Sequence, residues 1–444
     1  MNSINSNYKL LEIEKKIKKN LKVDPQNTNL FFSLGNLQIQ LNKIDEAKKN
    51  FKKIISLKPD FINSYFNLAV IHYKTGEFND SEFFFLKTIE LKNDYVQAYY
   101  GLGNAQIQLG KLVEAEHNFK KAISLKPDYV DAHNNLGVVL KELKKIDEAE
   151  NAYSQTLKLS PNHEMALLGR GQIYFNKGKF DLSLKDFELC DNIEAKANVL
   201  SSLYALGRID EIYKKIEIES KSNIENLYIA AFSSFIENKE KKITSNEFCK
   251  NPINFIYNSN LSFHFKNSKL FISKIIKEIY NLPGNWEPPG KTTHNGFQST
   301  FNIFENSQNN ISTLKSIILK EISAYKLKFE KQNCTFISNW PIKNKFFGWH
   351  VILKKQGHQT AHIHPSGWLS GVIYLKTVPH LSKNEGAIEF SLNGVNYFHK
   401  DSPSKIFLPN DGDIIFFPSS LHHKTIPFSA NEDRIIVSFD LIPK

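Results

Sequence analysis

Four side chains near the C-terminal end have the types and spacing of a metal centre beside an anion-binding group. His362 and His364 stand two residues apart, and His423 follows much later in the chain. Side chains at positions i and i+2 of a strand point to the same side, so a strand here would present both imidazoles together. Arg434 follows His423, and a guanidinium can hold a carboxylate at two points. These residues predict a metal enzyme with an acidic cosubstrate.

Arginine is so rare in this chain that each one calls for an explanation. Lysine and arginine together number 57, and only Arg170, Arg208 and Arg434 are arginines. The formal charge of +11 comes from lysines dispersed along the chain. No basic stripe with interleaved aromatic residues stands out, so we do not expect a nucleic-acid partner.

Length and composition predict a cytoplasmic protein of two or three domains. A chain of 444 residues is long enough for several separate cores. No apolar run approaches the length of a membrane span, and the N-terminal residues lack the apolar stretch of a secretory signal. The cysteines (Cys190, Cys249 and Cys334) are few, odd in number and far apart, which favours a reducing compartment and excludes a thiolate metal site. The sequence indicates no oligomeric state.

The elements before the histidines form a repeat array with a step of 34 residues. Three kinds of residue recur at this step. Prolines stand at Pro25, Pro59, Pro127 and Pro161, with Asn93 in the remaining place. Small residues recur as Ala47, Ser81, Ala115, Ala149 and Ser183, and aromatic residues as Phe51, Phe85, Phe119, Tyr153 and Phe187. Small residues let two helices approach closely, and the aromatic residue fills the space between them. This pattern resembles the tetratricopeptide repeat, a helix–turn–helix unit of 34 residues. A helix preceding the array would place Ile13 and Ile17 in the small and aromatic columns.

Repeat arrays of this kind usually present a groove to a protein or peptide partner. Four asparagines, Asn36, Asn67, Asn104 and Asn135, recur near the repeat step on the expected groove side. They could hydrogen-bond a peptide backbone in the groove, or they could be ordinary solvated polar residues.

From about residue 241 the repeat step is lost, and turn-forming and β-forming residues take over. We expect a helix over residues 268–280, another over 311–330, and alternating strands to the C-terminus. The fold class is therefore multidomain, an all-α repeat solenoid followed by an all-β barrel with flanking helices. The domains are expected at residues 1–25 (N-terminal helix), 26–195 (five repeats), 196–240 (degenerate repeats or capping helices), 241–284 (linker and helix) and 285–444 (barrel).

The C-terminal motifs resemble the double-stranded β-helix, a jelly-roll or cupin-like barrel, of the iron(II)- and 2-oxoglutarate-dependent oxygenases. The resemblance covers about residues 285–443 and is carried by AHIHPSGWLSGVIYL, the Gly-Asp turn, the FFP strand and the later histidine and arginine. It is closest to prolyl-hydroxylase-like members and to a bacterial and phage branch. It implies that His362 and His423 bind Fe(II), that Arg434 binds the distal carboxylate of 2-oxoglutarate, and that Tyr374 assists. It also implies that Asp413, in the turn, is structural.

The chain departs from this family pattern at the middle metal ligand, where His364 replaces a carboxylate. A third imidazole can fill this position, but it leaves the site more positive than a site with two histidines and a carboxylate. The alternative is that His364 faces the substrate or supports the ligands, with water completing the iron.

Other histidines fit the pattern less well. His399 and Asp401 have the spacing of the missing motif but lie too close to His423 for the intervening strands. His422 would point to the opposite face of a strand from His423. His350 and His358 could line the site, but each is interpreted as a satisfied surface histidine.

The function predicted by this resemblance is hydroxylation of a substrate C–H bond with dioxygen, Fe(II) and 2-oxoglutarate. The repeats would select the substrate, most plausibly a protein or peptide held in their groove. Two alternatives stay open. One is a repeat scaffold with a catalytically silent barrel, and the other is an oxygenase acting on a small metabolite or glycan.

Overall fold

The computed structural model describes residues 2–223, 225–288, 290–305, 307–379 and 381–444. The predicted N-terminal segment 1–25 includes Met1, which lies outside these ranges. The chain forms two compact units, residues 1–190 and 191–444, and each is described by itself.

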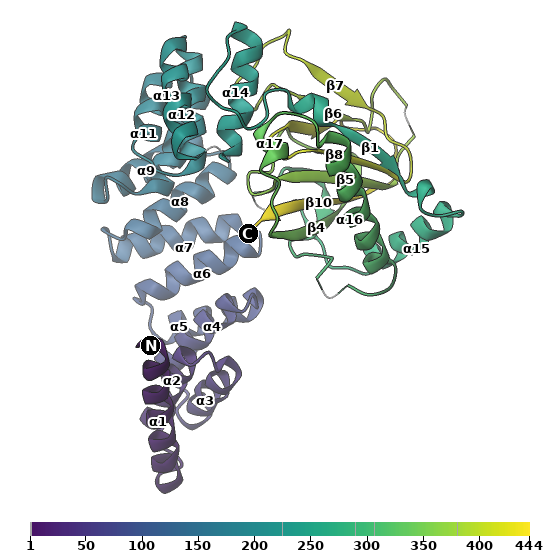
Figure 1. Ribbon diagram of the computed structural model, residues 1–444. Helices are drawn as coiled ribbons and strands as arrows, with labels where there is room; N and C mark the ends of the chain where they lie inside the picture. Colours follow the sequence, from purple (N-terminus) through teal and green to yellow (C-terminus); the bar gives the residue numbers. More distant parts are fainter. Residues whose placement is uncertain (1, 224, 289, 306, 380) are drawn as a thin grey trace. The chain divides into compact units, whose positions relative to one another are not determined.

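The first unit consists of a leading helix and five helical pairs (Figure 1). The leading helix is α1 (Asn2–Val23). The first helices of the pairs are α2 (Thr28–Gln40), α4 (Ile62–Lys74), α6 (Val96–Gln108), α8 (Val130–Glu142) and α10 (Glu164–Asn176). The second helices are α3 (Ile44–Leu57), α5 (Phe78–Leu91), α7 (Leu112–Leu125), α9 (Ile146–Leu159) and α11 (Phe180–Glu188). The all-helical repeat array is thereby confirmed.

In four of the five repeats a glycine of the first helix lies against the aromatic ring of the second helix, and Ala69 takes the place of that glycine in the remaining repeat. A Cβ atom built on Gly103 would lie 2.8 Å from the Phe119 ring, and one built on Gly137 would lie 2.7 Å from the Tyr153 ring. Both rings are buried. Because the ring rests directly on the backbone of the facing helix, only glycine allows this approach without displacing the ring.

The leading helix α1 does not use the packing columns of the repeats. Ile13 is 47% exposed, while the neighbouring Glu14 is buried. Glu14 pairs with Lys43 (2.6 Å) and accepts a hydrogen bond from Gln38 (3.3 Å). The prediction that Ile13 occupies the small-residue column is therefore wrong. In the repeats that column faces a partner helix within the pair, and α1 precedes the first such pair.

The second unit begins with helices α12 (Ile193–Ala205), α13 (Ile209–Ser222) and α14 (Leu227–Glu240). Two longer helices follow, α15 (Ser268–Tyr280) and α16 (Asn309–Phe329), close to the predicted ranges. Shorter helical turns are η1 (Pro252–Phe255), η2 (Leu261–Phe263) and α17 (Thr335–Ser338). The strands are β1 (Tyr257–Asn260), β2 (Asn285–Trp286), β3 (Thr293–Gln298), β4 (Asn344–Gln359), β5 (Leu369–Lys376), β6 (Ile388–Ser391), β7 (Ser404–Phe407), β8 (Asp413–Pro418), β9 (His422–Thr425) and β10 (Arg434–Pro443).

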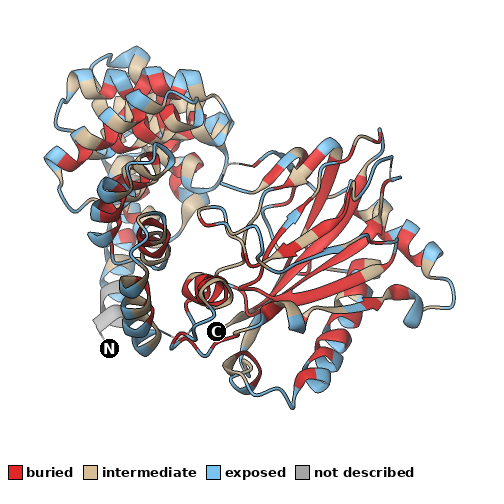
Figure 2. Ribbon diagram, turned by 90° about the horizontal axis from the view of Figure 1, so that it is seen from above, coloured by how far each residue is buried: buried red, intermediate tan, exposed pale blue. Residues whose placement is uncertain are grey.

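The strands form two antiparallel sheets. The larger has the order β1-β8-β5-β10-β4-β3-β2, and the smaller has the order β7-β6-β9. Helices α15 and α16 pack their apolar faces on one side of the larger sheet. Figure 2 shows the central strands almost wholly buried, whereas the helices are buried along one face only. The antiparallel sheet region with flanking helices is confirmed, and a closed double-stranded β-helix stays a prediction.

Alternation along β10 separates apolar from polar side chains. Ile435, Val437, Phe439 and Leu441 belong to the core shared with α15 and α16. The intervening residues Arg434, Ser438 and Asp440 face the opposite side, toward the histidines. Successive side chains of a strand point to opposite faces, so one strand supplies both core and site.

Among the described residues, no helix is both long enough and apolar enough to span a membrane.

Candidate metal centre

His362 and His364 lie in the loop between β4 and β5, and not within a regular strand as the sequence predicted. His362 forms one isolated antiparallel bridge with His423, in which each backbone N–H donates to the other carbonyl at 3.1 Å. The His364 N–H donates to the Ser419 carbonyl at 3.0 Å. Pro365 then begins a turn and has no N–H to donate, so the pairing ends there.

The loop and β9 nevertheless bring the three predicted imidazoles together. The ring centroids of His362 and His364 are 5.2 Å apart, and the His423 centroid is 4.3 Å from the first and 5.0 Å from the second. One nitrogen of each ring lies within 4.8 Å of the others. Three nitrogens at this separation can converge on one metal ion.

Each imidazole has one nitrogen engaged by an oxygen acceptor. His362 Nδ1 is 2.6 Å from the Thr360 carbonyl, and His423 Nδ1 is 3.2 Å from the Leu421 carbonyl. His364 Nδ1 is 2.6 Å from the Asp440 carboxylate. When Nδ1 donates its hydrogen, Nε2 carries a lone pair. All three rings are therefore held as potential Nε2 ligands.

The environment disfavours protonation of two of these imidazoles, His362 and His423. Burial, followed by the nearby His364, lowers the pKa of His362 to about 3. Burial also holds the pKa of His423 well below its ordinary value, and the other two imidazoles add to this effect. Neutral imidazole is the form that binds a metal.

Arg434 lies in a narrow pocket between the two sheets. Its side chain is 1% exposed, and none of its three guanidinium nitrogens has a hydrogen-bond partner among the residues that the structure describes. The guanidinium lies 5.0 Å from the centre of the Tyr374 ring, whose hydroxyl also lacks a partner. Burial lowers the pKa of Arg434, and it raises the pKa of Tyr374 to about 12 despite the nearby cation. A buried cation with unused donors fits a carboxylate ligand.

The pocket around Arg434 also reaches the histidines. His364, His423, Tyr374 and Arg434 all contribute to its lining. Its free volume is only about 10 Å³, so a bound dicarboxylate would require the lining side chains to move apart.

A larger cleft of about 480 Å³ opens on the other side of His364. His362 and His364 lie at its floor, and aromatic side chains from β4 (Phe347 and Trp349) form part of its wall. His364 and Gln359 line both the cleft and the narrow pocket. The imidazole cluster therefore stands between a buried cation and an open cleft, as a cosubstrate site and a substrate site would require.

The other histidines lie apart from this cluster. His422 faces away from it, with its ring centroid 5.7 Å from that of Tyr397. His399 and Asp401 lie in the loop between β6 and β7, and Asp413 accepts hydrogen bonds from Asn260 and the Asn410 backbone.

His350 differs from its prediction. It is 1% exposed and its Nδ1 lacks a partner, so the interpretation as a satisfied surface histidine is wrong. The β4 strand is covered on the face that carries His350. His358 is half-buried, and its Nδ1 lies 3.1 Å from the Gln356 carbonyl.

Sequence analysis missed the partners of His364. Asp440 and Ser370 form a buried hydrogen-bond network with this imidazole. A signal for Asp440 was present, because it is a lone carboxylate in an apolar strand and shares the alternation of Arg434.

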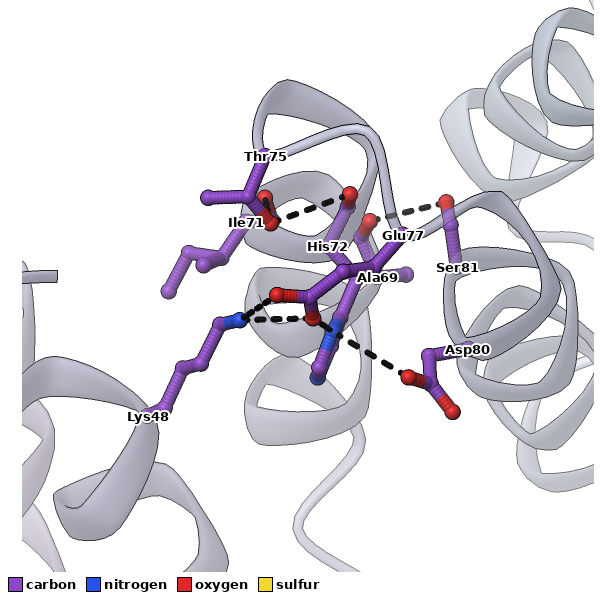
Figure 3. A network of polar contacts seen from close by, with 8 residues as sticks. All are labelled: Lys48, Ala69, Ile71, His72, Thr75, Glu77, Asp80 and Ser81. Carbon is purple, nitrogen blue, oxygen red and sulfur yellow. Dashed lines mark hydrogen bonds and ion pairs between the residues drawn. The ribbon is translucent and has the colours of Figure 1, made fainter. Parts of the chain in front are cut away.

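A second group of metal-type side chains lies in the repeats, at His72, Glu77 and Asp80 (Figure 3). The Lys48 ammonium contacts both Glu77 carboxylate oxygens, at 2.7 and 2.8 Å, and His72 contacts one of them. The carboxylate is already neutralised by a cation, so we interpret this group as an ion-pair network.

Comparisons with known proteins match both parts of the chain. Residues 348–440 match the family model described as "Putative 2OG-Fe(II) oxygenase". Tetratricopeptide-repeat models match residues 35–76, 62–95, 96–129, 130–163 and 166–196. The N-terminal region carries tetratricopeptide repeats, and a model described as putative 2OG-Fe(II) oxygenase matches the C-terminal region. All three histidines and Arg434 lie within the residues that this model matches.

Several solved structures show low similarity to part of this chain. The crystal structure of MamA is 24% identical, covering 40% of this chain and 97% of that one, with a TM-score of 0.35. YrrB, described as a TPR protein with an unusual peptide-binding site, is 17% identical, covering 44% and 97%, with a TM-score of 0.37. PilF of Pseudomonas aeruginosa is 16% identical, covering 49% and 99%, with a TM-score of 0.40. No curated protein sequence is significantly similar to this chain.

Proposed function

We propose that the chain is an Fe(II)- and 2-oxoglutarate-dependent dioxygenase whose sheet region forms a double-stranded β-helix. The observation that carries the proposal is a cluster of three imidazoles, two of which (His364 and His423) share a pocket with a buried guanidinium that has no hydrogen-bond partner among the described residues. A zinc hydrolase would have no use for that guanidinium. With both groups bound, the site would supply chemistry in which one oxygen atom of dioxygen enters succinate as 2-oxoglutarate loses CO2, and the other atom hydroxylates a substrate C–H bond.

The metal would be held by Nε2 of His362, His364 and His423. Their Nδ1 atoms are fixed by acceptors, so the rings would need little reorientation on binding. Burial favours the neutral forms of His362 and His423, which are the forms that coordinate a metal.

The cosubstrate's distal carboxylate would pair with Arg434. The guanidinium offers donors that no protein acceptor uses, and the Tyr374 hydroxyl offers one more. Pairing would remove the cost of an isolated buried cation, which is large when no anion compensates it.

The substrate would enter the open cleft beside His362 and His364. We propose that it is a protein or peptide segment selected by the repeats, in a cytoplasmic setting. Support comes from the repeat family and from three cysteines that form no disulfide. In this row of asparagines, Asn67 donates to Asn36 and Asn135 donates to Asn104, each at 2.8 Å. Asn135 also donates to the Tyr100 hydroxyl and accepts from Asn134, so a peptide backbone would replace part of this network on binding.

The test is succinate release from 2-oxoglutarate by the full chain, supplied with Fe(II) and dioxygen. We expect release that depends on both additions and that His423→Asn abolishes. His422→Asn is the matched control, because His422 stands next to the ligand but faces Tyr397. We expect it to retain turnover.

The alternatives give different results. A parent protein that binds metal but releases no succinate with any substrate pool would support a catalytically silent scaffold. Turnover stimulated by small metabolites or glycans, with no peptide retained by the chain, would support the other alternative. Equal loss in His422→Asn and His423→Asn would contradict the assignment of His423.

A further inference from the structure

The third imidazole of the cluster differs from the other two in its hydrogen-bond acceptor. His362 and His423 face neutral backbone carbonyls. His364 Nδ1 instead faces a carboxylate oxygen, Asp440 Oδ1, at 2.6 Å. His364 is also the residue that stands where a carboxylate ligand is expected.

The Asp440 carboxylate is held in a defined position. The residue is only 9% exposed. Ser370 on β5 is the register partner of Asp440, and its hydroxyl donates to Asp440 Oδ1 at 2.6 Å. The Ser370 hydroxyl is also 2.7 Å from that of Ser419.

The Gly367 backbone packs closely against this network. A Cβ atom built on Gly367 would lie 2.6 Å from the Ser419 hydroxyl and 3.3 Å from the Asp440 carboxyl carbon. Asp440 itself is not one of the clustered metal-type residues, which among the described parts of this unit are the three histidines. Its place is behind His364 and not beside the metal.

A carboxylate in this place would act on the metal through the imidazole. Accepting the Nδ1 hydrogen fixes the tautomer and the ring orientation, leaves Nε2 as the ligand, and makes that nitrogen a better donor. It also brings a negative charge close to a site of three neutral ligands, where a two-histidine, one-carboxylate site would have a charged ligand.

We infer that Asp440 is a positioning residue for the metal centre, which orients His364 and supplies through it the negative charge that no direct ligand carries. This inference rests on the proposed function, because it assumes that the histidines bind a metal. It assigns His364 as a metal ligand. The charge of Asp440 would then compensate for the carboxylate ligand that His364 replaces.

The test is titration of the metal-free full chain with Co(II), followed by the visible absorption of the bound ion. We expect Asp440→Asn, which keeps the size but removes the charge, to weaken Co(II) binding roughly 10- to 100-fold and to change the bound-ion spectrum. Asp411→Asn is the matched control. Asp411 is an exposed carboxylate that accepts from Thr377 in the same unit, and its variant should bind as the parent does.

A double-mutant cycle separates positioning from a general structural effect. If Asp440 acts through His364, then Asp440→Asn should add little to the loss caused by His364→Ala. If Asp440→Asn does not fold, as judged by thermal unfolding without metal, Ser370→Ala provides the same test. It frees the carboxylate and should weaken binding in the same direction.

The outcomes distinguish this inference from the proposed function. The inference would be overturned if a folded Asp440→Asn bound Co(II) with the affinity and spectrum of the parent. It would also be overturned if Asp440→Asn lowered the Co(II) affinity of His364→Ala by as much as it lowers that of the parent. Neither 2-oxoglutarate nor turnover enters the titration, so an inactive enzyme would leave the inference standing. A parent chain that binds no Co(II) would overturn both.

Discussion

At the scale of single residues, the site depends on two charged side chains that face the same side of β10. Arg434 is buried without a partner, while Asp440 is buried with two donors. An unpaired buried cation is costly, so its retention in a chain with few arginines indicates a ligand. Asp440 is already satisfied, which indicates a fixed supporting role.

The Tyr374 hydroxyl provides a prediction on cosubstrate affinity. Tyr374→Phe removes the unpartnered hydroxyl beside Arg434 and leaves the ring in place. Loss of one hydrogen bond to a carboxylate should weaken 2-oxoglutarate binding roughly 10-fold or somewhat more. The measurement is the 2-oxoglutarate dependence of succinate release. An unchanged dependence would mean that Tyr374 does not contact the cosubstrate.

His350 predicts acid sensitivity of the fold. Burial lowers the pKa of His350 to about 4, below the ordinary value of 6.5. Between these pH values the unfolded chain binds a proton that the folded chain does not. The free energy of unfolding should therefore fall by about 1.4 kcal/mol for each pH unit that the solution is acidified. His350→Leu should make this fall shallower in urea unfolding measured at pH 7 and pH 5, and equal slopes would contradict it.

At the scale of elements, the repeats could be predicted almost completely, since five successive helical pairs repeat one packing rule. Helices α15 and α16 were found from their apolar spacing for the same reason. The His364–Asp440 contact could not be predicted, because it depends on the turn after Pro365 and on the register between β5 and β10. The exposure of Ile13 was not predicted, because residues of the small-residue column are buried only where the other helix of a pair packs against them.

The glycine–aromatic contact predicts the cost of a small change in one repeat. In Gly137→Ala the new methyl group would lie 2.7 Å from the Tyr153 ring, which is buried and cannot move freely. We expect the free energy of unfolding of the repeat array to fall by about 1–3 kcal/mol. Glu142→Ala, at an exposed position of the same helix, should change it by less than about 0.5 kcal/mol. Equal stabilities in chemical denaturation would contradict the packing account.

At the scale of the whole molecule, one chain carries tetratricopeptide repeats and a region that matches a putative 2OG-Fe(II) oxygenase family. The resemblance found in the sequence predicted this combination, and both family models match it. The identity of the substrate could not be predicted. The residues at groove positions are determined by the partner that they bind, whereas the recurring columns are determined by the packing of the helices. The asparagine row is the feature of the groove that can be tested directly.

Substrate selection by the repeats predicts that binding and turnover can be separated. Replacing both Asn67 and Asn135 by alanine in the full chain should reduce peptide capture on an array by about 10-fold or more, because backbone hydrogen bonds are lost. Succinate release without substrate should stay at the parent level. Asn93→Ala, in an exposed turn, is the matched control. Undiminished capture in the double variant would exclude the asparagine row as the peptide site.

The central claim is that 2-oxoglutarate binds at a metal held by the histidines, with its far carboxylate on Arg434. The most direct measurement is the visible absorption spectrum of the full chain under anaerobic conditions, with Fe(II) added first and 2-oxoglutarate second. The account predicts a weak metal-to-ligand charge-transfer band that appears only with both additions. The band should be lost in Arg434→Gln but retained in Arg208→Gln, which changes an exposed arginine paired with Glu211. No band in the parent chain, or an equal band in Arg434→Gln at the same 2-oxoglutarate concentration, would contradict the account.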